Sequence, residues 1–291
     1  MKGIIMTGGN GTRLYPVTKS INKSLLPVYD KPLIYYSLSV LMTAGINDII
    51  LLTGRRDFKL FRNLLGDGSQ LGLHLNYRIE EVQLGTAGAF IYGRDLIGHD
   101  PFAVILGDNA FFGPEIAADI KAATNSFRKE GGPQLVCSYV DNPQDFGVVR
   151  LDKEGKLISL DRRSQNPKSS CAVTGLFYFE NETLERLKDA EHAKDADEAN
   201  NRFRGMLDQY PHEGKLHHYI LDKSTIWYDV GRPGRLYEAS RAVRHFQEKT
   251  GTYAGCIEEI AYKNGWIDRK QIRRLAAGLQ GTEYGSYLMG L

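Results

Sequence analysis

The stretch from Lys2 to Leu14 reads K-G-I-I-M-T-G-G-N-G-T-R-L, and it decides how the chain begins to fold. Its apolar run, from Ile4 to Met6, is typical of a buried strand. The run leads directly into a glycine-rich segment. Because glycine lacks a Cβ, the backbone there can turn sharply and approach a bulky group closely. A strand that opens straight into such a loop predicts a binding site at the mouth of a sheet.

The loop itself favours an anion. Gly8, Gly9 and Gly11 are followed by Thr12 and Arg13. Successive backbone N–H groups in such a turn form a concave anion nest, and a following helix start adds partial positive charge. The guanidinium of Arg13 is suited to two phosphate oxygens at once. We therefore predict a loop for a nucleoside triphosphate, with a glycine turn that binds nothing as the alternative.

Two well-known phosphate loops do not fit this segment. A P-loop requires G-x-x-x-x-G-K-[ST], and neither Lys-Ser nor Lys-Thr follows these glycines. The dinucleotide fingerprint G-x-G-x-x-G also fails, because Gly9 and Gly11 are followed by Leu14 where a third glycine is needed. A Rossmann dehydrogenase is therefore disfavoured.

Composition limits the classes of protein that fit. The chain has 291 residues, 42% hydrophobic and 25% charged, with a net charge of +2. These values fit a globular α/β protein and give no field that would attract nucleic acid. No leader peptide is evident and no apolar run approaches the roughly 18 residues of a membrane span, so we expect a cytoplasmic protein without membrane contact. Cys137, Cys171 and Cys256 lack metal-ligand spacing and are expected to be reduced and buried.

Strand and helix patterns alternate in the first part of the chain. Strands are expected at 4–6, 48–52, 73–79 and 101–106, and helices at 33–44, 57–65 and 88–97. This alternation predicts parallel strands joined by crossover helices. Ligands of such sheets bind at the carboxyl ends of the strands, where residues 8–13 and 107–109 both lie.

The pattern changes after residue 134. Strands are expected at 135–140, 147–151, 157–160, 172–179, 215–220 and 227–231, and helices at 191–201 and 235–245, with two more between 256 and 280. We predict an α/β fold with a mixed, mainly parallel central sheet and flanking helices. The predicted domains are a core over 1–250 and a small helical appendage over 251–291, which could serve as an oligomer surface.

Two aspartates follow apolar strands. Asp108 comes directly after Val104–Leu106, and Asp229 follows Ile226–Tyr228. Carboxylate and phosphate oxygens are the ligands that Mg²⁺ prefers, so the two aspartates could share one Mg²⁺ ion at the triphosphate. The alternative for either residue alone is a turn or a helix cap. Lys23 could be either an exposed loop residue or a ligand of phosphate. Gly85 could either leave room for a flat nucleotide base or simply form the turn that begins a helix.

Eight segments in order resemble one family and cover nearly the whole chain. They are M-T-G-G-N-G-T-R-L-Y-P, K-S-L-L-P-V-Y-D-K-P-L-I-Y-Y, L-G-D-G-S-Q-L-G, L-G-D-N, F-G-V-V, P-K-S, A-V-T-G-L-F-Y-F and A-Y-K-N-G-W-I. They are similar to glucose-1-phosphate thymidylyltransferases. The resemblance implies a nucleotidyltransferase fold, a Rossmann-like three-layer sandwich, with a nucleotide-binding half near 1–130 and a sugar-phosphate-binding half near 131–250.

The resemblance also implies a reaction. A nucleoside triphosphate and a sugar 1-phosphate give a nucleoside diphosphate sugar and pyrophosphate, with dTTP and glucose 1-phosphate as the default substrates. It further implies Mg²⁺, a homotetramer and, in many members, a second regulatory nucleotide site.

The family's site residues fall on known positions of this chain. By this resemblance, Asp108 and Asp229 hold the Mg²⁺. Arg13 acts on the leaving pyrophosphate and Lys23 near the reacting phosphates. Gly8 and Gly11 line the nucleotide, while Gly147 and Val173 line the sugar.

The chain departs from the family at the base. The family's base-reading glutamine falls on Glu80. An amide both donates and accepts, which suits thymine or uracil, whereas an ionised carboxylate only accepts. Guanine offers two adjacent N–H donors to such a carboxylate. A guanylyltransferase that uses GTP and a sugar other than glucose is therefore the alternative, unless Glu80 points elsewhere or Gln83 reads a pyrimidine.

The chain also departs at the sugar. The family's sugar-binding glutamate and phosphate-binding lysine fall on Arg162 and Arg163. Arg163 retains a cation for phosphate, but Arg162 cannot accept a hydroxyl proton, which predicts a changed sugar pocket. The family's Glu-Leu-Glu-Ile-Thr-Asp segment is absent around 194–201, and Ser24 replaces a glutamine. A non-catalytic nucleotide sensor is a lesser alternative, since the expected metal and phosphate residues are all present.

Overall fold

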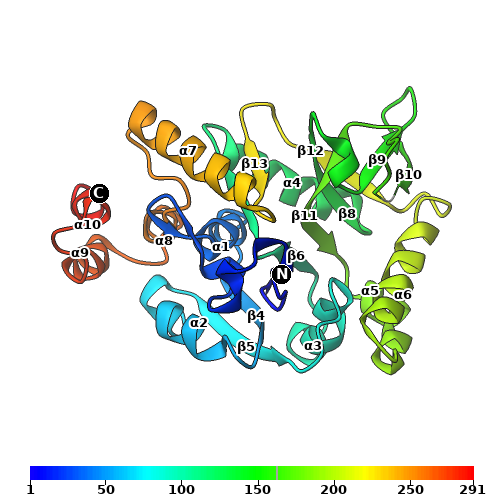
Figure 1. Cartoon of the computed structure of the whole chain (residues 1–291), viewed down its shortest axis with the longest axis horizontal. Coiled ribbons are helices and arrows are strands. Elements are labelled where there is room, and N and C mark those ends of the chain that lie inside the picture. Colours follow the sequence, from blue (N-terminus) through cyan, green and yellow to red (C-terminus); the bar gives the residue numbers. More distant parts are fainter. Residues whose placement is uncertain (162) are drawn as a thin grey trace.

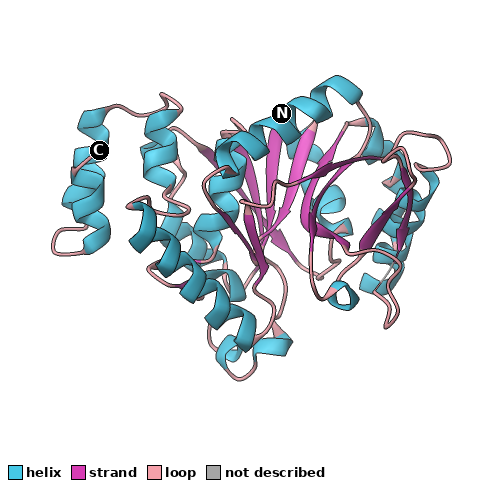
Figure 2. Cartoon of the chain, turned by 90° about the horizontal axis from the view of Figure 1, so that it is seen from above, coloured by secondary structure: helices cyan, strands magenta, loops and turns pink. Residues whose placement is uncertain are grey.

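The computed structural model describes residues 1–161 and 163–291, and within them nine strands form one central sheet. Along the main path the strand order is β10-β9-β11-β6-β1-β4-β5, and β8 joins β11 to β12. Helices cover the sheet on both sides (Figure 2). The predicted three-layer α/β fold with a mixed, mainly parallel sheet is confirmed.

The half of the sheet that carries the glycine loop is parallel. Its strands are β1 (Lys2–Met6), β4 (Asp48–Gly54), β5 (His74–Glu80) and β6 (Phe102–Leu106), and its helices are α1 (Ile34–Thr43), α2 (Phe58–Leu65) and α3 (Ala87–Ile97). β1 pairs in parallel with both β4 and β6, and β4 pairs in parallel with β5. All seven predicted elements are confirmed to within a few residues.

Neighbouring residues of β1 point to opposite faces of the sheet. Ile5 packs into a core with Leu38 of α1 and Phe61 of α2, whereas Ile4 packs with Phe90 of α3 and with Phe203. Strand side chains alternate between faces, so a continuous apolar run can only be buried where helices cover both. The run in β1 therefore requires the three-layer arrangement.

The second half of the sheet is largely antiparallel. It consists of β8 (Gln134–Tyr139), β9 (Val148–Leu151), β10 (Leu157–Asp161), β11 (Cys171–Phe179) and β12 (His217–Ile220). β11 pairs antiparallel with β6 and so joins the two halves. Outside this sheet, β13 (Ile226–Asp229) pairs with β7 (Asn109–Phe112), and β2 (Pro27–Val28) pairs with β3 (Lys31–Pro32).

Several elements were not predicted. β7 and the long helix α4 (Ile116–Glu130) follow β6, and α5 (Glu182–Arg186) follows β11. The helix expected over 191–201 instead begins at Ala196, where Asp195 accepts from the Glu198 N–H, and α6 continues to Gln209. Residues 188–192 form a separate 3-10 turn. The sequence pattern placed this helix too early because its charged residues extend on both sides of the cap.

The last part of the chain is helical. α7 (Pro233–Thr250) is followed by α8 (Ile257–Lys263) and α9 (Arg269–Ala277), which confirms the two helices predicted there, and by the unpredicted α10 (Glu283–Met289). α8 packs into the same apolar core as α1, whereas α9 and α10 form a second cluster together with Cys256 and Tyr262, at the start of α8 and within it. These two helices project at the end of the molecule farthest from α6 (Figure 1).

A buried carboxylate ties α4 to the segment that precedes β13. Asp119 accepts hydrogen bonds from the Tyr219 hydroxyl (3.1 Å), the Asp222 N–H (2.9 Å) and the Thr225 hydroxyl. Hydrogen bonds to a buried charge are among the stronger ones in proteins. Since β13 carries Asp229, this network helps to position one of the predicted metal ligands.

The Asp119→Ala variant should have a free energy of unfolding about 3 kcal/mol lower than the unmodified protein, because three donors, among them the buried Thr225 hydroxyl, lose their acceptor. Urea-induced unfolding followed by circular dichroism measures this difference. Lys121→Ala, an exposed change on the same helix, is the control and should change the unfolding free energy by less than about 0.5 kcal/mol. Equal free energies of unfolding for the two variants would contradict the stabilising role of the Asp119 hydrogen bonds.

Candidate active site

The glycine loop lies at the carboxyl end of β1, as predicted. Both the N–H and the hydroxyl of Thr7 donate to the Leu52 carbonyl, at 2.8 and 2.7 Å, and so tie the start of the loop to β4. Gly8 and Gly9 then line a cavity of about 440 Å³. Gly11 has a φ of 60°, in the left-handed region that favours glycine.

A second cavity of about 580 Å³ adjoins the first. We call the cavity lined by the glycine loop the loop cavity, and the larger one, lined by α6, the helix cavity. They share four lining residues, which are Thr86, Leu106, Asp108 and Asn200. The site is therefore one continuous cleft in two parts, and Asp108 lies at their junction.

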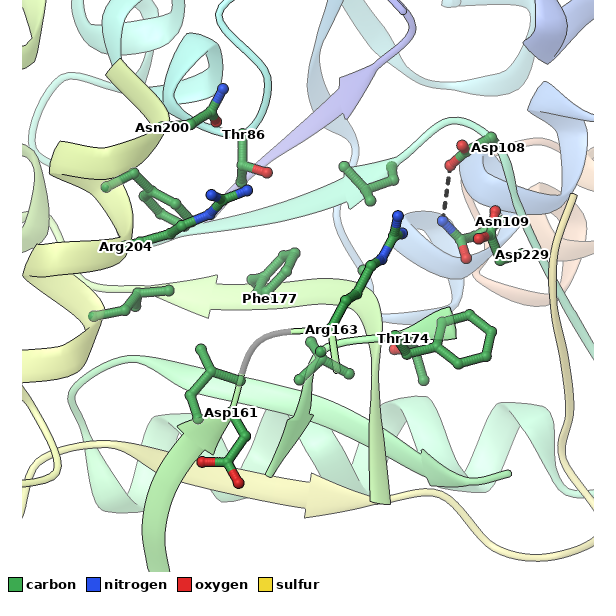
Figure 3. Close-up of a pocket in the computed structure, with 18 of the residues that line it drawn as sticks. Thr86, Asp108, Asn109, Asp161, Arg163, Thr174, Phe177, Asn200, Arg204 and Asp229 are labelled. Carbon is green, nitrogen blue, oxygen red and sulfur yellow. Dashed lines mark hydrogen bonds between the residues drawn. The ribbon is translucent and has the colours of Figure 1, made fainter. Parts of the chain in front are cut away.

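Asp108 and Asp229 are brought together by the pairing of β7 with β13. This pairing sets Asp229 opposite Asn109, and the Val230 N–H donates to the Asp108 carbonyl at 2.9 Å. Both carboxylates border the helix cavity and lie near each other in Figure 3. Burial and the nearby Asp108 carboxylate raise the pKa of Asp229. Two mutually repelling carboxylates of this kind suit a divalent cation.

Three cations surround this carboxylate pair. Lys23 forms an ion pair with Asp108 through its Nζ atom. Arg13 passes over Gly231, where an added Cβ would lie 2.7 Å from the guanidinium and 2.9 Å from Asp229 Oδ1. Together with Arg163 these cations lower the pKa of Asp229 and so oppose the effect of burial. The junction thus carries both signs of charge in close proximity.

Asn22 holds the segment that carries Lys23. Its amide donates to the Thr7 carbonyl at 2.9 Å and to Asp57 Oδ2 at 2.8 Å, while its oxygen accepts from the Ser24 N–H. These contacts join the lysine segment to the glycine loop. Sequence reasoning missed Asn22, although an asparagine before a short turn is a common cap.

Asn109 and Trp227 orient Asp108. Asn109 donates to Asp108 Oδ1 at 2.9 Å (dashed in Figure 3) and accepts from the Trp227 indole N–H at 2.7 Å. These two hydrogen bonds together fix the orientation of the Asp108 carboxylate. Sequence reasoning missed both residues, because the partner of Asn109 lies on a strand more than a hundred positions away.

The helix cavity contains the positions expected for the sugar. Gly147 and Val173 line it, and the Val173 N–H donates to the Gly147 carbonyl at 2.9 Å. Arg163 reaches from its loop toward the junction (Figure 3), and in the described part of the chain it has no ion-pair partner. Arg162, also predicted to bind the sugar, lies outside the described residues.

One face of α6 closes the helix cavity. Asn200, Arg204 and Asp208 are spaced four residues apart, so they share a face of the helix, and all three line the cavity. The sequence predicted a charged helix over 191–201, but none of these three residues was among the predicted site residues. A polar stripe at this spacing is the signal that could have indicated a ligand-facing helix.

Glu80 and Gly85 line the other part of the cleft, the loop cavity. Glu80 ends β5 and is only 5% exposed. Burial raises the pKa of its carboxyl to about 7. Gly85 has a φ of 56°, and a Cβ there would lie 2.6 Å from the Asn200 amide, so only glycine fits between the turn and α6.

Comparison with known proteins agrees with this geometry. The family model described as "Nucleotidyl transferase" matches residues 2–245. Glucose-1-phosphate thymidylyltransferases of Neisseria meningitidis and Mycobacterium tuberculosis are each 39% identical to this chain over 291 residues, which cover all of it and 99% of each relative.

The chain belongs to the nucleotidyl transferase family. Solved structures support the same conclusion. A putative glucose-1-phosphate thymidylyltransferase from Bacillus anthracis, in complex with a sucrose, has a TM-score of 0.75 and 32% identity, covering 84% of this chain and 95% of that one. A UDP-glucose pyrophosphorylase complexed with UDP-glucose has a TM-score of 0.70 and 25% identity, covering 84% and 98%.

Most of the predicted site residues of this nucleotidyl transferase lie around one cleft. Gly8, Gly9, Lys23, Glu80 and Gly85 line the loop cavity, and Arg13, Gly147, Arg163, Val173 and Asp229 line the helix cavity, with Asp108 in both. Gly11 and Thr12, both described, lie outside the lining of the two cavities, in the turn that follows the loop. Their predicted contact with the nucleotide stays a prediction.

Other expectations concern the whole of this nucleotidyl transferase. Cys137, Cys171 and Cys256 are buried free thiols, as predicted. Within the described residues, no helix combines the length and the apolar character needed to cross a membrane.

Proposed function

We propose that this nucleotidyl transferase couples dTTP to glucose 1-phosphate and releases pyrophosphate. The observation that carries the proposal is the junction of the two cavities, where Asp108 and Asp229 lie among Arg13, Lys23 and Arg163. The names of the relatives support the two substrates. The presence of both aspartates and all three cations weighs against a non-catalytic nucleotide sensor.

The reaction joins two polyanions. An oxygen of the sugar phosphate attacks the α-phosphorus of the triphosphate in line and forms the new P–O bond. The bond from the α-phosphorus to the oxygen that bridges it to the β-phosphorus breaks, and pyrophosphate leaves with that electron pair. Catalysis then consists mainly of positioning and of neutralising charge. We assign Lys23 to the reacting phosphates and Arg13 to the leaving pyrophosphate.

Asp108 and Asp229 fit a divalent cation, and we propose Mg²⁺. Within the described residues, no group of three or more His, Cys, Asp or Glu side chains could hold a metal unaided. Two carboxylates completed by phosphate oxygens and water match the way proteins usually bind Mg²⁺. The ion would supply positive charge to the α-phosphate.

Pyrophosphate release from the purified protein with Mg²⁺ tests this proposal. Every nucleoside triphosphate should be assayed against several sugar 1-phosphates, and dTTP with glucose 1-phosphate should be the fastest pair. A faster reaction with another sugar would overturn the sugar assignment. Failure to release pyrophosphate from any pair would refute the reaction.

Arg163 is proposed to hold the phosphate of the sugar 1-phosphate. The Arg163→Gln variant should raise the KM for the sugar phosphate about 30-fold, because a charged hydrogen bond of about 2 kcal/mol is lost. Initial-rate kinetics at saturating triphosphate measure the change. Arg128→Gln, an exposed change on α4, is the control and should leave the KM unaltered. An equal rise in the KM for the triphosphate would contradict this role.

GTP remains the second candidate for the nucleotide. The observation that favours it is the position of Glu80 in the wall of the loop cavity. An ionised carboxylate accepts from both the N1–H and the N2–H₂ of guanine. The same panel of triphosphates separates the two candidates.

The remaining proposals concern the assembly. The resemblance to the thymidylyltransferases supports a homotetramer and a cytoplasmic location. We also propose that residues 251–291 form a separate appendage, as predicted. The second apolar cluster, which α9 and α10 share with residues of α8, supports this, although α8 also packs into the main core.

A further inference from the structure

Among the described residues, none donates a hydrogen bond to the buried carboxyl of Glu80. Its Oε1 atom is fully buried and has no partner among the described residues, and the side chain lines the loop cavity. An ionised carboxylate pays a large desolvation cost unless donors or cations compensate it. The uncharged acid avoids most of this cost. The cavity wall therefore favours a protonated Glu80.

Two glycines clamp this carboxyl. A Cβ on Gly8 would lie 1.7 Å from Oε2, and a Cβ on Gly88 in α3 would lie 2.4 Å from Oε1. No larger residue fits at either position without moving the carboxyl. Backbone therefore packs against both oxygens, and the clamp holds the group in one orientation at the cavity.

Charged groups on the neighbouring strands do not compensate Glu80. Arg55, just after β4, pairs with Glu81, and both side chains are more than half exposed. On β5 itself, Arg78 pairs with Asp95 of α3. These cations are thus already engaged with other carboxylates, away from the cavity.

The groups across the loop cavity are paired or neutral. Lys23 is engaged with Asp108, and Asn200 and Thr86 carry no charge. Burial alone accounts for the raised pKa of Glu80. A proton on this carboxyl is thus available near neutral pH.

We propose that Glu80 reads the base of the triphosphate, and that it reads thymine as the uncharged acid. The inference rests on the proposed function and names the residue that sets its nucleotide. The uncharged acid has one O–H donor and one carbonyl acceptor, the same pair that an amide offers. Its carbonyl accepts from the thymine N3–H, and its O–H donates to an adjacent ring carbonyl.

Ionisation of Glu80 reverses the preference for thymine. An ionised Glu80 sets two acceptors against thymine, so one oxygen faces a ring carbonyl and is repelled. Guanine instead offers N1–H and N2–H₂ side by side to the same two oxygens. One side chain therefore selects thymine when protonated and guanine when ionised, and the selectivity depends on pH.

The ratio of kcat/KM for dTTP to that for GTP tests the inference between pH 6 and 8.5. It should fall about tenfold for each pH unit across this range, because thymine requires the proton that guanine excludes. The phosphate chemistry is common to both nucleotides, so its pH dependence affects each rate but drops out of their ratio. A ratio that is constant over this range would overturn the inference.

Two variants assign the effect to one residue. Glu80→Gln should favour dTTP with a ratio independent of pH, whereas Glu81→Gln, the exposed neighbour, should keep the pH dependence of the unmodified protein. A pH-dependent ratio that persists in Glu80→Gln would refute the role of Glu80. Pyrophosphate release by either variant shows that the proposed reaction stands even if this inference fails.

Proton uptake gives a readout independent of turnover. At pH 8, dTTP binding measured by calorimetry in two buffers of different ionisation enthalpy should take up close to one more proton in the unmodified protein than in Glu80→Gln. The comparison removes the contribution of the triphosphate itself. Equal uptake by the two proteins would contradict protonation on binding.

Discussion

The Asp108→Asn variant should lose about 10³-fold in kcat, or about 4 kcal/mol of transition-state stabilisation. The reason is its place at the junction of the two cavities, near Asp229 and paired with Lys23. The asparagine keeps the shape but removes the negative charge, so the proposed cation is held weakly and Lys23 loses its partner. Pyrophosphate release at saturating substrates measures the loss.

A titration with Mg²⁺ separates this effect from misfolding. The variant should require a much higher Mg²⁺ concentration for half-maximal rate and should unfold at the same temperature as the unmodified protein. Asp95→Asn, which removes a carboxylate from an exposed pair with Arg78, serves as the control and should change neither value. An unchanged Mg²⁺ requirement in Asp108→Asn would refute its role as a ligand.

The Arg13→Gln variant should lose between about 10² and 10³-fold in kcat, because the charge that develops on the leaving pyrophosphate loses its cation. Within the described residues the Arg13 guanidinium makes no ion pair, although it lies beside Asp229 across Gly231. It is therefore free to engage phosphate. Single-turnover measurements isolate this step from product release.

Arg13→Lys separates charge from geometry. It should recover part of the rate but remain about tenfold below the unmodified protein, since an ammonium cannot bind two oxygens in one plane. Arg55→Gln, in an exposed ion pair with Glu81, is the control. A kcat in Arg13→Gln within twofold of the unmodified value would be incompatible with the proposed role.

Local patterns in the chain sufficed to predict the parallel half of the sheet. The apolar run at Ile4–Met6 and the glycines after it specify a strand and a turn through interactions within a few residues. Residues 8–13 and 107–109 were expected at one edge of the sheet because parallel strands end together. The structure confirms that placement for Gly8, Gly9 and Asp108.

Other parts of the site depend on distant partners. Nothing local to Asn109 indicates that it bonds Trp227, because the strand pairing that joins them spans more than a hundred residues. The face of α6 with Asn200 and Arg204 became part of the site only through packing across the cleft. Charged residues around its start obscured where the helix begins.

For this protein, residue order was enough to establish the α/β class, the glycine loop and the two strand-end aspartates, because backbone propensity and apolar periodicity act over a few neighbouring residues. The raised pKa of Glu80 could come only from the folded chain. Its carboxyl loses water when Gly8 and Gly88 close around it, and that enclosure brings the loop after β1 against β5 and α3, which lie far along the chain. How well a carboxyl is solvated depends on the atoms around it, and these atoms come together only when the chain folds.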